Sequence, residues 1–125
     1  MIGGIGVDAV SLARTDRLSD AFLRRFYHPD EAAAAKALSG SRRREFLASR
    51  FAAKEAFCKA LGVGLWTFQL RDVLVFRMDS GKPEIRLFDS ARAYFDKAHP
   101  EGRIHLSLSH EDPLAVAFVV IEDLS

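Results

Sequence analysis

The sequence has little cysteine and no long apolar run. Cys58 is the single cysteine among 125 residues, which excludes an intrachain disulfide and fits a reducing compartment, where the residue would serve as a small buried hydrophobe. The apolar start from Met1 to Val10 has no basic leader, carries Asp8 and is too short to span a membrane. We therefore expect a cytoplasmic protein with no membrane partner.

Neither sign of charge dominates the sequence. The formal net charge is +1, so the total does not point to a nucleic-acid binder. Hydrophobic residues make up 49% of the chain, a profile that excludes disorder and predicts one globular domain over residues 1–125. The distribution of charge is more informative, because many arginines fall before residue 45: Arg14, Arg17, Arg24, Arg25, Arg42, Arg43 and Arg44.

Familiar catalytic signatures are also missing. The sequence has no His/Cys spacing typical of a metal site, no Gly-x-Ser-x-Gly nucleophile motif and no phosphate-binding Gly-x-x-x-x-Gly-Lys-Ser/Thr loop. It also has no internal repeat. Candidate chemistry must therefore come from individual charged residues in unusual surroundings.

The most unusual stretch is Arg50–Gly62. Good helix formers fill it, and Gly62 stands where a left-handed C-terminal cap belongs, so we predict a helix from Glu45 to Leu61. At about 100° per residue, its large apolar side chains form one broad stripe, into which Arg50 and Lys54 also project. The charged residues of this helix therefore need partners from elsewhere.

The hydrophobic periods predict an α+β fold, with a small antiparallel sheet packed against several helices including this long central one. Ile2–Val10 is typical of a buried strand and Leu114–Glu122 of a central or interface strand, because both are apolar nearly throughout. In the preceding hairpin strand, alternation places His105, Ser107 and Ser109 on one polar face. The remaining expected elements are a helical segment Ser11–Phe26, a short helix from Asp30 that ends at Ser39–Ser41, strands at Asp72–Met78, Glu84–Leu87 and Ile104–His110, a turn at Asp79–Pro83 and a helix at Asp89–Ala98.

Two carboxylates each have two interpretations. Asp8 ends a buried strand, where an unpaired charge is costly, so it either caps the following helix or binds a metal. Glu55 lies one turn before Lys59, and the two form either an ordinary i,i+4 pair or part of a site. With Arg50 and Lys54 nearby, the set suits phosphoryl transfer, because Mg²⁺ takes one or two protein carboxylates while cations neutralise phosphate charge.

The arginines also have more than one interpretation. Arg14, Arg17 and Arg24 share one side of the first predicted helix, which suits an acidic protein, a phosphate backbone or a solvated face. The run Arg42–Arg44 alone is compatible with nucleic-acid binding. We do not expect nucleic acid as a partner, because no recognition-helix or aromatic-sheet motif accompanies the run and the net charge is near neutral.

Three blocks of the sequence resemble the signature motifs of the holo-acyl carrier protein synthases, the short members of the 4'-phosphopantetheinyl transferase superfamily. The blocks are Gly6-Val7-Asp8 followed by Arg14, the stretch Arg50–Gly62, and His105–His110. They extend from the first expected strand to the last hairpin. The chain length also matches the short class and not the longer class that serves peptide synthetases.

The resemblance implies a reaction, the Mg²⁺-dependent transfer of the 4'-phosphopantetheine arm from coenzyme A to a serine of apo-acyl carrier protein, with release of adenosine 3',5'-bisphosphate. It implies that Asp8 and Glu55 bind the metal and that Lys59 lies near the transferring phosphate, which makes these three the candidate catalytic residues. It also implies a homotrimer with sites between subunits.

The resemblance further implies two sets of substrate contacts. Arg50 and Lys54 would hold coenzyme A phosphates, and Arg14, Arg24 and Arg25 on the first helix would dock the acidic recognition helix of the carrier protein. The residues implied to line the coenzyme are Gly81, Lys82, Pro83, His105 and Ser109.

Several alternatives stay open from the sequence. Glu55, a metal-bound water or another carboxylate could deprotonate the serine, either Mg²⁺ or Mn²⁺ could be the working ion, and both the preferred carrier protein and the use of acyl-coenzyme A are undetermined. A competing class is a non-enzymatic trimeric module that holds an acidic protein or RNA on its Arg-rich helices. Such a module predicts salt-dependent binding without magnesium and no catalytic role for Glu55 or Lys59.

Overall fold

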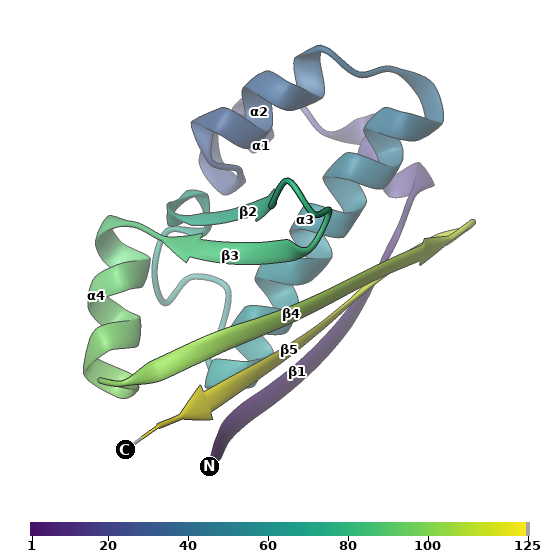
Figure 1. The fold of residues 1–125 in the computed structure, drawn as a ribbon. Coiled ribbons are helices and arrows are strands. Elements are labelled where there is room, and N and C mark those ends of the chain that lie inside the picture. Colours follow the sequence, from purple (N-terminus) through teal and green to yellow (C-terminus); the bar gives the residue numbers. More distant parts are fainter. Residues whose placement is uncertain (125) are drawn as a thin grey trace.

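The computed structural model describes residues 1–124, in which helices pack with two antiparallel sheets (Figure 1). The predicted α+β class is confirmed, with two sheets in place of the single expected one. Met1 lies beside the end of β5, because its ammonium group donates to the carbonyl of Asp123 at 2.8 Å. The elements are β1 Ile2–Ser11, the 3-10 turn η1 Ala13–Arg17, α1 Asp20–Phe26, α2 Pro29–Lys36, α3 Gly40–Leu61, the 3-10 turn η2 Leu70–Asp72, β2 Val73–Arg77, β3 Pro83–Leu87, α4 Asp89–Ala98, β4 Gly102–Glu111 and β5 Leu114–Asp123.

The larger sheet has the strand order β1-β5-β4, and both strand pairs are antiparallel. β5 is its central strand, as the apolar run predicts, and Ala117 and Val119 on its inner face are fully buried. The predicted alternation on β4 is also confirmed, because His105, Ser107 and Ser109 all lie exposed on the outer face. The smaller sheet pairs β2 with β3.

Helix α3 has 22 residues and packs along β1 and β5 (Figure 1). It begins at Gly40, more than one turn earlier than predicted, so Arg42–Arg44 lie inside its first turns instead of preceding it. Gly40 has a positive φ of 58°, and the chain enters the helix there instead of breaking. The predicted C-terminal cap is confirmed, because Gly62 has φ 74° and its N–H donates to the Lys59 carbonyl at 3.0 Å.

Strand β1 and helix α3 approach so closely that their main chains touch. A Cβ atom at Gly4 would lie 2.0 Å from the carbonyl oxygen of Ala60, and one at Gly6 would lie 2.0 Å from that of Ala56. Only glycine fits at these two positions. The contact brings Asp8, two residues after Gly6, beside the C-terminal half of α3.

The core lies between the larger sheet and the helices and is rich in phenylalanine. The rings of Phe57 and Phe95 lie 6.0 Å apart, and Phe26 meets Phe51 edge-on at 6.3 Å. Cys58 is buried in this core, and burial raises the pKa of its thiol to about 12. The prediction that Cys58 is a structural hydrophobe is therefore confirmed.

Two predicted elements differ from the structure. Ser11–Phe26 is not one helix, because the chain forms the 3-10 turn η1 and then the short helix α1, whose start Ser19 caps by accepting the N–H of Phe22 at 3.1 Å. Asp72, predicted as a strand residue, ends η2 and accepts the N–H of Ser90 at 3.1 Å. No helix within residues 1–124 has both the length and the apolar character needed to cross a membrane.

Candidate active site

Asp8 lies inside β1, opposite Ala117 of β5. It does not cap a helix, since Leu12 is the residue before η1 and makes no side-chain cap, so that alternative is wrong. Only 12% of the Asp8 side chain is exposed. The carboxylate is therefore largely buried at the contact between β1 and α3.

The carboxyl groups of Asp8 and Glu55 lie close enough to influence each other's charge. Burial, then the charge of Asp8 and a side-chain hydrogen bond with it, raise the pKa of Glu55 to about 7. The positive charges of Arg14 and Lys59 oppose this shift in part. Two carboxyl groups this close ionise together only at a cost, so the pair attracts a proton or a cation.

Lys59 lies against this pair from the next turn of α3. Its ammonium group donates to Asp8 Oδ1 at 2.8 Å and to the Val7 carbonyl at 3.2 Å, so its ion-pair partner comes from β1 and not from its own helix. Its side chain is 57% exposed and, with Ile5, Val7 and Phe118, lines an open hollow of about 350 Å³. The ammonium group can therefore contact a ligand that enters the hollow.

The donor set of the pair fits magnesium. Within residues 1–124, no cluster of three or more His, Cys, Asp or Glu side chains is placed to hold an ion, so Asp8 and Glu55 could supply only part of a coordination shell. Mg²⁺ commonly takes one or two carboxylates and completes its octahedron with waters and substrate phosphates. Structural zinc sites instead need four protein ligands, usually nitrogen and sulfur.

Arg50 lies in a different hollow, of about 280 Å³. Its guanidinium group lies 4.1 Å from the centre of the Phe46 ring, and its Nη1 donates to Ser49 Oγ at 3.0 Å. Burial and the charge of nearby Arg77 lower the pKa of Arg50, and its buried Nε has no hydrogen-bond partner in the part of the chain that the structure describes. A buried cation with a free donor beside a second arginine suits an anion such as a phosphate. The hollow is also lined by Leu38, Arg42, Glu45 and His110.

A third hollow, of about 360 Å³, lies where the β2–β3 turn meets β4. Lys82 and His105 both line it, so the structure brings these two predicted residues together. Gly81 supports the turn with φ 89°, and Pro83 begins β3. Ser109 lies farther along the exposed face of β4. The other cations that line this hollow are Arg92 and Arg103.

Lys54 does not face a phosphate site. Its side chain is fully buried, and its ammonium group lies 2.7 Å from Glu31 Oε1. It also donates to the carbonyl of Leu70 at 3.2 Å and to that of Val73. All three of its donors have internal acceptors. The predicted contact of Lys54 with coenzyme A phosphates is therefore wrong.

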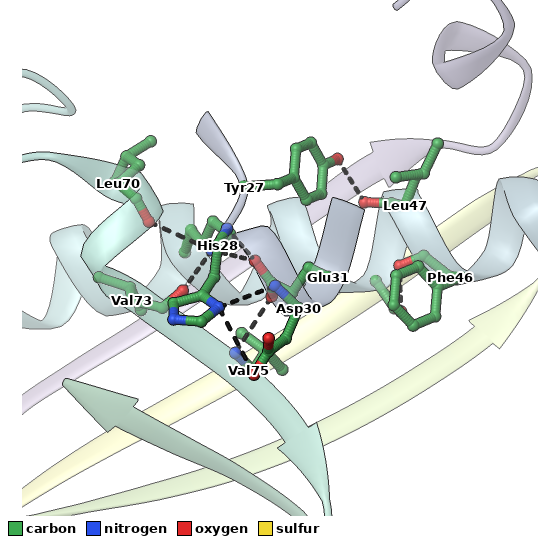
Figure 2. Close-up of polar contacts among 11 residues, drawn as sticks. Tyr27, His28, Asp30, Glu31, Phe46, Leu47, Leu70, Val73 and Val75 are labelled. Atoms are coloured by element: carbon green, nitrogen blue, oxygen red, sulfur yellow. Dashed lines mark hydrogen bonds and ion pairs between the residues drawn. The ribbon is translucent and has the colours of Figure 1, made fainter. Parts of the chain in front are cut away.

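Glu31 organises the buried network around this lysine (Figure 2). Its Oε1 also accepts the N–H of His28 at 2.8 Å, and its Oε2 accepts the N–H of Val75 at 3.1 Å. Burial lowers the pKa of Lys54, and the charge of Glu31 opposes that shift. Glu31 falls within the short helix predicted from Asp30 and had no other predicted role. The sequence contains one indication that Glu31 pairs with a lysine: Lys54 lies inside an apolar stripe, where its charge requires a buried acidic partner.

The predicted docking residues lie at the surface. Arg24 and Arg25 occupy the last turn of α1, and Arg14 lies in η1, all of them exposed. Arg14 is close enough to Glu55 for its charge to lower the pKa of that carboxyl group. Of the three arginines, Arg14 is therefore the one shown to lie near the carboxylate pair.

The Arg50 hollow contains residues that the sequence analysis missed. Arg42, Phe46 and Arg50 are spaced i, i+4, i+8 and line one side of α3. The same spacing was visible in the sequence, but placing the helix start at Glu45 left Arg42 outside the helix. From the sequence, Arg42 is therefore predicted only as a member of the basic run Arg42–Arg44.

Comparisons with known proteins agree with this fold. The family model described as the 4'-phosphopantetheinyl transferase superfamily matches residues 4–119. A holo-[acyl-carrier-protein] synthase of Halothermothrix orenii is 42% identical over 130 residues, covering 98% of this chain and 99% of the relative. A crystal structure of the Bacillus anthracis synthase in complex with CoA (3',5'-ADP) is 40% identical, with a TM-score of 0.82 and 98% of each chain covered. The Neisseria meningitidis synthase is 34% identical, with a TM-score of 0.84, covering 98% of this chain and 99% of the other.

The fold and the carboxylate pair thus have a family context that spans nearly the whole chain. The chain belongs to the 4'-phosphopantetheinyl transferase superfamily. Within that superfamily, the full-length matches place it in the family of holo-[acyl-carrier-protein] synthases. The resemblance seen in the three sequence blocks is therefore confirmed.

Proposed function

We propose that this chain transfers the 4'-phosphopantetheine group of coenzyme A to a serine of apo-acyl carrier protein and releases adenosine 3',5'-bisphosphate. The observation that carries the proposal is the pair of neighbouring carboxyl groups of Asp8 and Glu55, with Lys59 ion-paired to Asp8 on the exposed side, in a member of this enzyme family. Phosphoryl transfer depends chiefly on positioning and on charge neutralisation, which such a cluster provides. The reaction would take place in the cytoplasm as part of fatty acid biosynthesis.

Asp8 and Glu55 would hold Mg²⁺. When bound, the ion would neutralise negative charge on the coenzyme A pyrophosphate. The exposed ammonium group of Lys59, which now pairs with Asp8, would bind the transferring phosphate from the adjoining hollow. A site built from two carboxylates and one lysine therefore separates the role of holding the metal from that of holding the phosphate.

The remaining coenzyme contacts would come from the two other hollows. The guanidinium group of Arg50, with Arg77 beside it, would bind a phosphate in the first. Lys82 and His105, supported by Gly81 and Pro83 in the turn, would line the coenzyme in the second. Ser109 lies on the same outer face of β4 as His105 and would extend that lining.

A homotrimer with sites between subunits would bring these separate hollows together. The outer face of the larger sheet supports this assembly, because Ile5 is 60% exposed, Val7 55% and Phe118 44%. An exposed apolar patch of this kind is expected to be covered by protein. Since the same three residues line the Lys59 hollow, a copy seated there would add its own residues to the site. Light scattering coupled to size-exclusion chromatography would measure the number of chains.

The carrier protein would dock on the basic surface formed by Arg14, Arg24 and Arg25. All three side chains are exposed, and Arg14 is close enough to act on the charge of Glu55, near which the acceptor serine must arrive. Complementary charge would speed the encounter with an acidic helix and help to select the partner.

Mass spectrometry of apo-acyl carrier protein incubated with coenzyme A, magnesium and this protein tests the function directly. We expect a mass increase equal to one phosphopantetheine arm with the wild type and none with Asp8→Asn or Glu55→Gln, while circular dichroism reports an intact fold for both. Asp30→Asn is the matched control, because its carboxylate is exposed and lies on α2. Near-normal transfer by either active-site variant would remove the metal assignment.

The non-enzymatic binding module predicts a different result. It would give no mass increase with the wild type, and it would bind an acidic protein or RNA tightly without magnesium and with a steep dependence on salt. The same samples, measured at two salt concentrations, therefore distinguish the two classes.

A further inference from the structure

We infer that Glu122 is a positioning residue for the coenzyme, because its carboxylate holds the imidazole ring of His105 in the orientation that contacts the ligand. The inference rests on the proposed function, in which His105 lines the coenzyme in the hollow where the β2–β3 turn meets β4. No site role is predicted for Glu122 from the sequence. Its position in the sheet nevertheless sets it apart from the residues around it.

Glu122 is an acidic residue on an otherwise apolar side of β5. The three preceding outward positions of this strand are all apolar: Val116, Phe118 and Val120. The inward residues that alternate with them are fully buried. Glu122 continues the outward series, with 40% of its side chain exposed. A carboxylate that interrupts such a series indicates a specific polar partner.

The partner of Glu122 is a histidine and not the cation directly opposite. In the register of β4 and β5, Arg103 lies opposite Glu122, whereas His105 lies opposite Val120. An ordinary cross-strand ion pair joins directly opposed residues. Glu122 Oε1 instead lies 3.0 Å from His105 Nε2, and among residues 1–124 the carboxylate has no ion pair with Arg103. The carboxylate therefore reaches diagonally across the sheet to the imidazole ring.

This contact decides which ring nitrogen of His105 faces a ligand. An ionised carboxylate can only accept a hydrogen bond, so the hydrogen of the contact belongs to Nε2. Nδ1 is then the nitrogen left for another molecule. It is an acceptor in the neutral ring and a donor in the imidazolium ion, whose positive charge Glu122 would balance. A phosphate oxygen at Nδ1 would therefore be bound by the imidazolium form.

Glu122 acts from outside the hollow. His105 lines the hollow, but Glu122 is not among its lining residues in the part of the chain that the structure describes. The His105 side chain is 52% exposed, so packing alone does not fix its ring. The other charged residues of the lining are mainly cations, which suits an anionic ligand such as a phosphate of the coenzyme; they are Lys82, Glu84, Arg92 and Arg103. A ring held against Glu122 adds a hydrogen-bonding group at a fixed place among them.

Calorimetry of coenzyme A binding tests the inference without any transfer step. Glu122→Ala removes the acceptor and is expected to raise the Kd for coenzyme A about fivefold, the scale of one hydrogen bond. Glu122→Gln keeps an acceptor oxygen at the same reach and should recover most of the lost affinity. The matched control is Glu111→Ala at the other end of β4, an exposed acid that should leave the Kd within about twofold of the wild type.

Steady-state kinetics should place the effect on one substrate only. Glu122→Ala should raise the KM for coenzyme A, while kcat and the KM for carrier protein stay within about twofold of the wild type. An equal rise in both KM values would contradict the inference, because a ring that contacts the coenzyme has no reason to affect the carrier protein.

A double-mutant cycle shows whether Glu122 acts through His105. In a His105→Ala background, Glu122→Ala should cause no further rise in the Kd for coenzyme A, because the ring that it positions is absent. Additive effects of the two substitutions would overturn the inference. An unchanged Kd in Glu122→Ala, with an intact fold by circular dichroism, would overturn it as well.

Two further measurements separate this inference from the proposed function. Light scattering of Glu122→Ala should give the same number of chains as the wild type, and a change would assign the carboxylate to a contact between subunits instead. A wild type that transfers normally while His105→Ala binds coenzyme A with unchanged affinity would overturn the inference and leave the proposed reaction standing. Failure of the wild type in the mass assay would instead remove the proposed function itself.

Discussion

The buried ion pair between Lys54 and Glu31 makes a strong prediction about stability. Both side chains are at most 1% exposed, and the Glu31 carboxylate accepts hydrogen bonds from Lys54, His28 and Val75. In Glu31→Gln the amide nitrogen must face one of these donors, and the lysine loses its countercharge. Removing one partner of a buried pair costs about 3–5 kcal/mol. We expect a loss of this size in the free energy of unfolding, measured by urea denaturation followed by circular dichroism.

The double variant tests the reasoning behind that magnitude. Glu31→Gln combined with Lys54→Met removes the uncompensated charge and should be more stable than Glu31→Gln alone. The matched control is Asp96→Asn in the exposed pair with Arg92 on α4, which should change stability by less than about 1 kcal/mol. A cost below about 1 kcal/mol for Glu31→Gln would refute the argument. A Lys54→Met variant with normal stability and a raised KM for coenzyme A would also refute the argument. Such a result would support the contact between Lys54 and a phosphate that the sequence predicted.

Three further predictions concern the site and the scaffold that positions it. Because the pKa of Glu55 is raised from 4.5 to about 7, the folded state binds more protons than the unfolded state between these pH values. The stability due to Glu55 is therefore present below pH 4.5 and is lost as the pH rises through 7. Without magnesium, the melting temperature of the wild type should fall between pH 5.5 and pH 8 by more than that of Glu55→Gln. The double variant Arg14→Glu/Arg24→Glu should raise the KM for carrier protein at least tenfold more than it raises the KM for coenzyme A. The steady-state assays should be run at about 0.05 M salt, where charge is weakly screened. An equal rise in both KM values would contradict docking on this surface. Gly6→Ala places a Cβ atom 2.0 Å from a carbonyl oxygen of α3, so it should lower the free energy of unfolding, measured with urea, by more than about 2 kcal/mol. Gly81→Ala is the control in the open β2–β3 turn, where the only strain comes from its φ of 89°. It should lower the free energy of unfolding by less.

The sequence predicted the carboxylate pair well, because both residues violate a local rule. Asp8 interrupts an apolar strand, and Glu55 belongs to a helix whose charges lie among its apolar residues, so each required a partner from elsewhere. In the structure they are each other's neighbours, and Lys59 joins them. The pattern could not specify the distance, which depends on how closely β1 approaches α3.

The predictions were wrong where a residue's partner, or the end of a helix, depends on contacts with parts of the chain that are distant in sequence. Lys54 and Arg50 have the same sequence context, yet Lys54 is neutralised by Glu31 from α2 while Arg50 keeps a free donor. Only the tertiary fold distinguishes them. The 3-10 turn η1 was predicted as part of a helix because its period is close to that of an α-helix. The predicted start of α3 at Glu45 lies too far along the chain, because Ser39–Ser41 is typical of a chain break. In the structure the helix begins within that segment, at Gly40.

The contact of Gly4 and Gly6 with α3 affects how freely the rest of the chain can vary. Since the strand and the helix meet through main-chain atoms, the spacing of the two carboxylates does not depend on the size of any intervening side chain. Substitutions that repack the phenylalanine core should leave this spacing unchanged. Directed evolution of the substrate surfaces could then alter many residues around the site, provided that it conserves these two glycines.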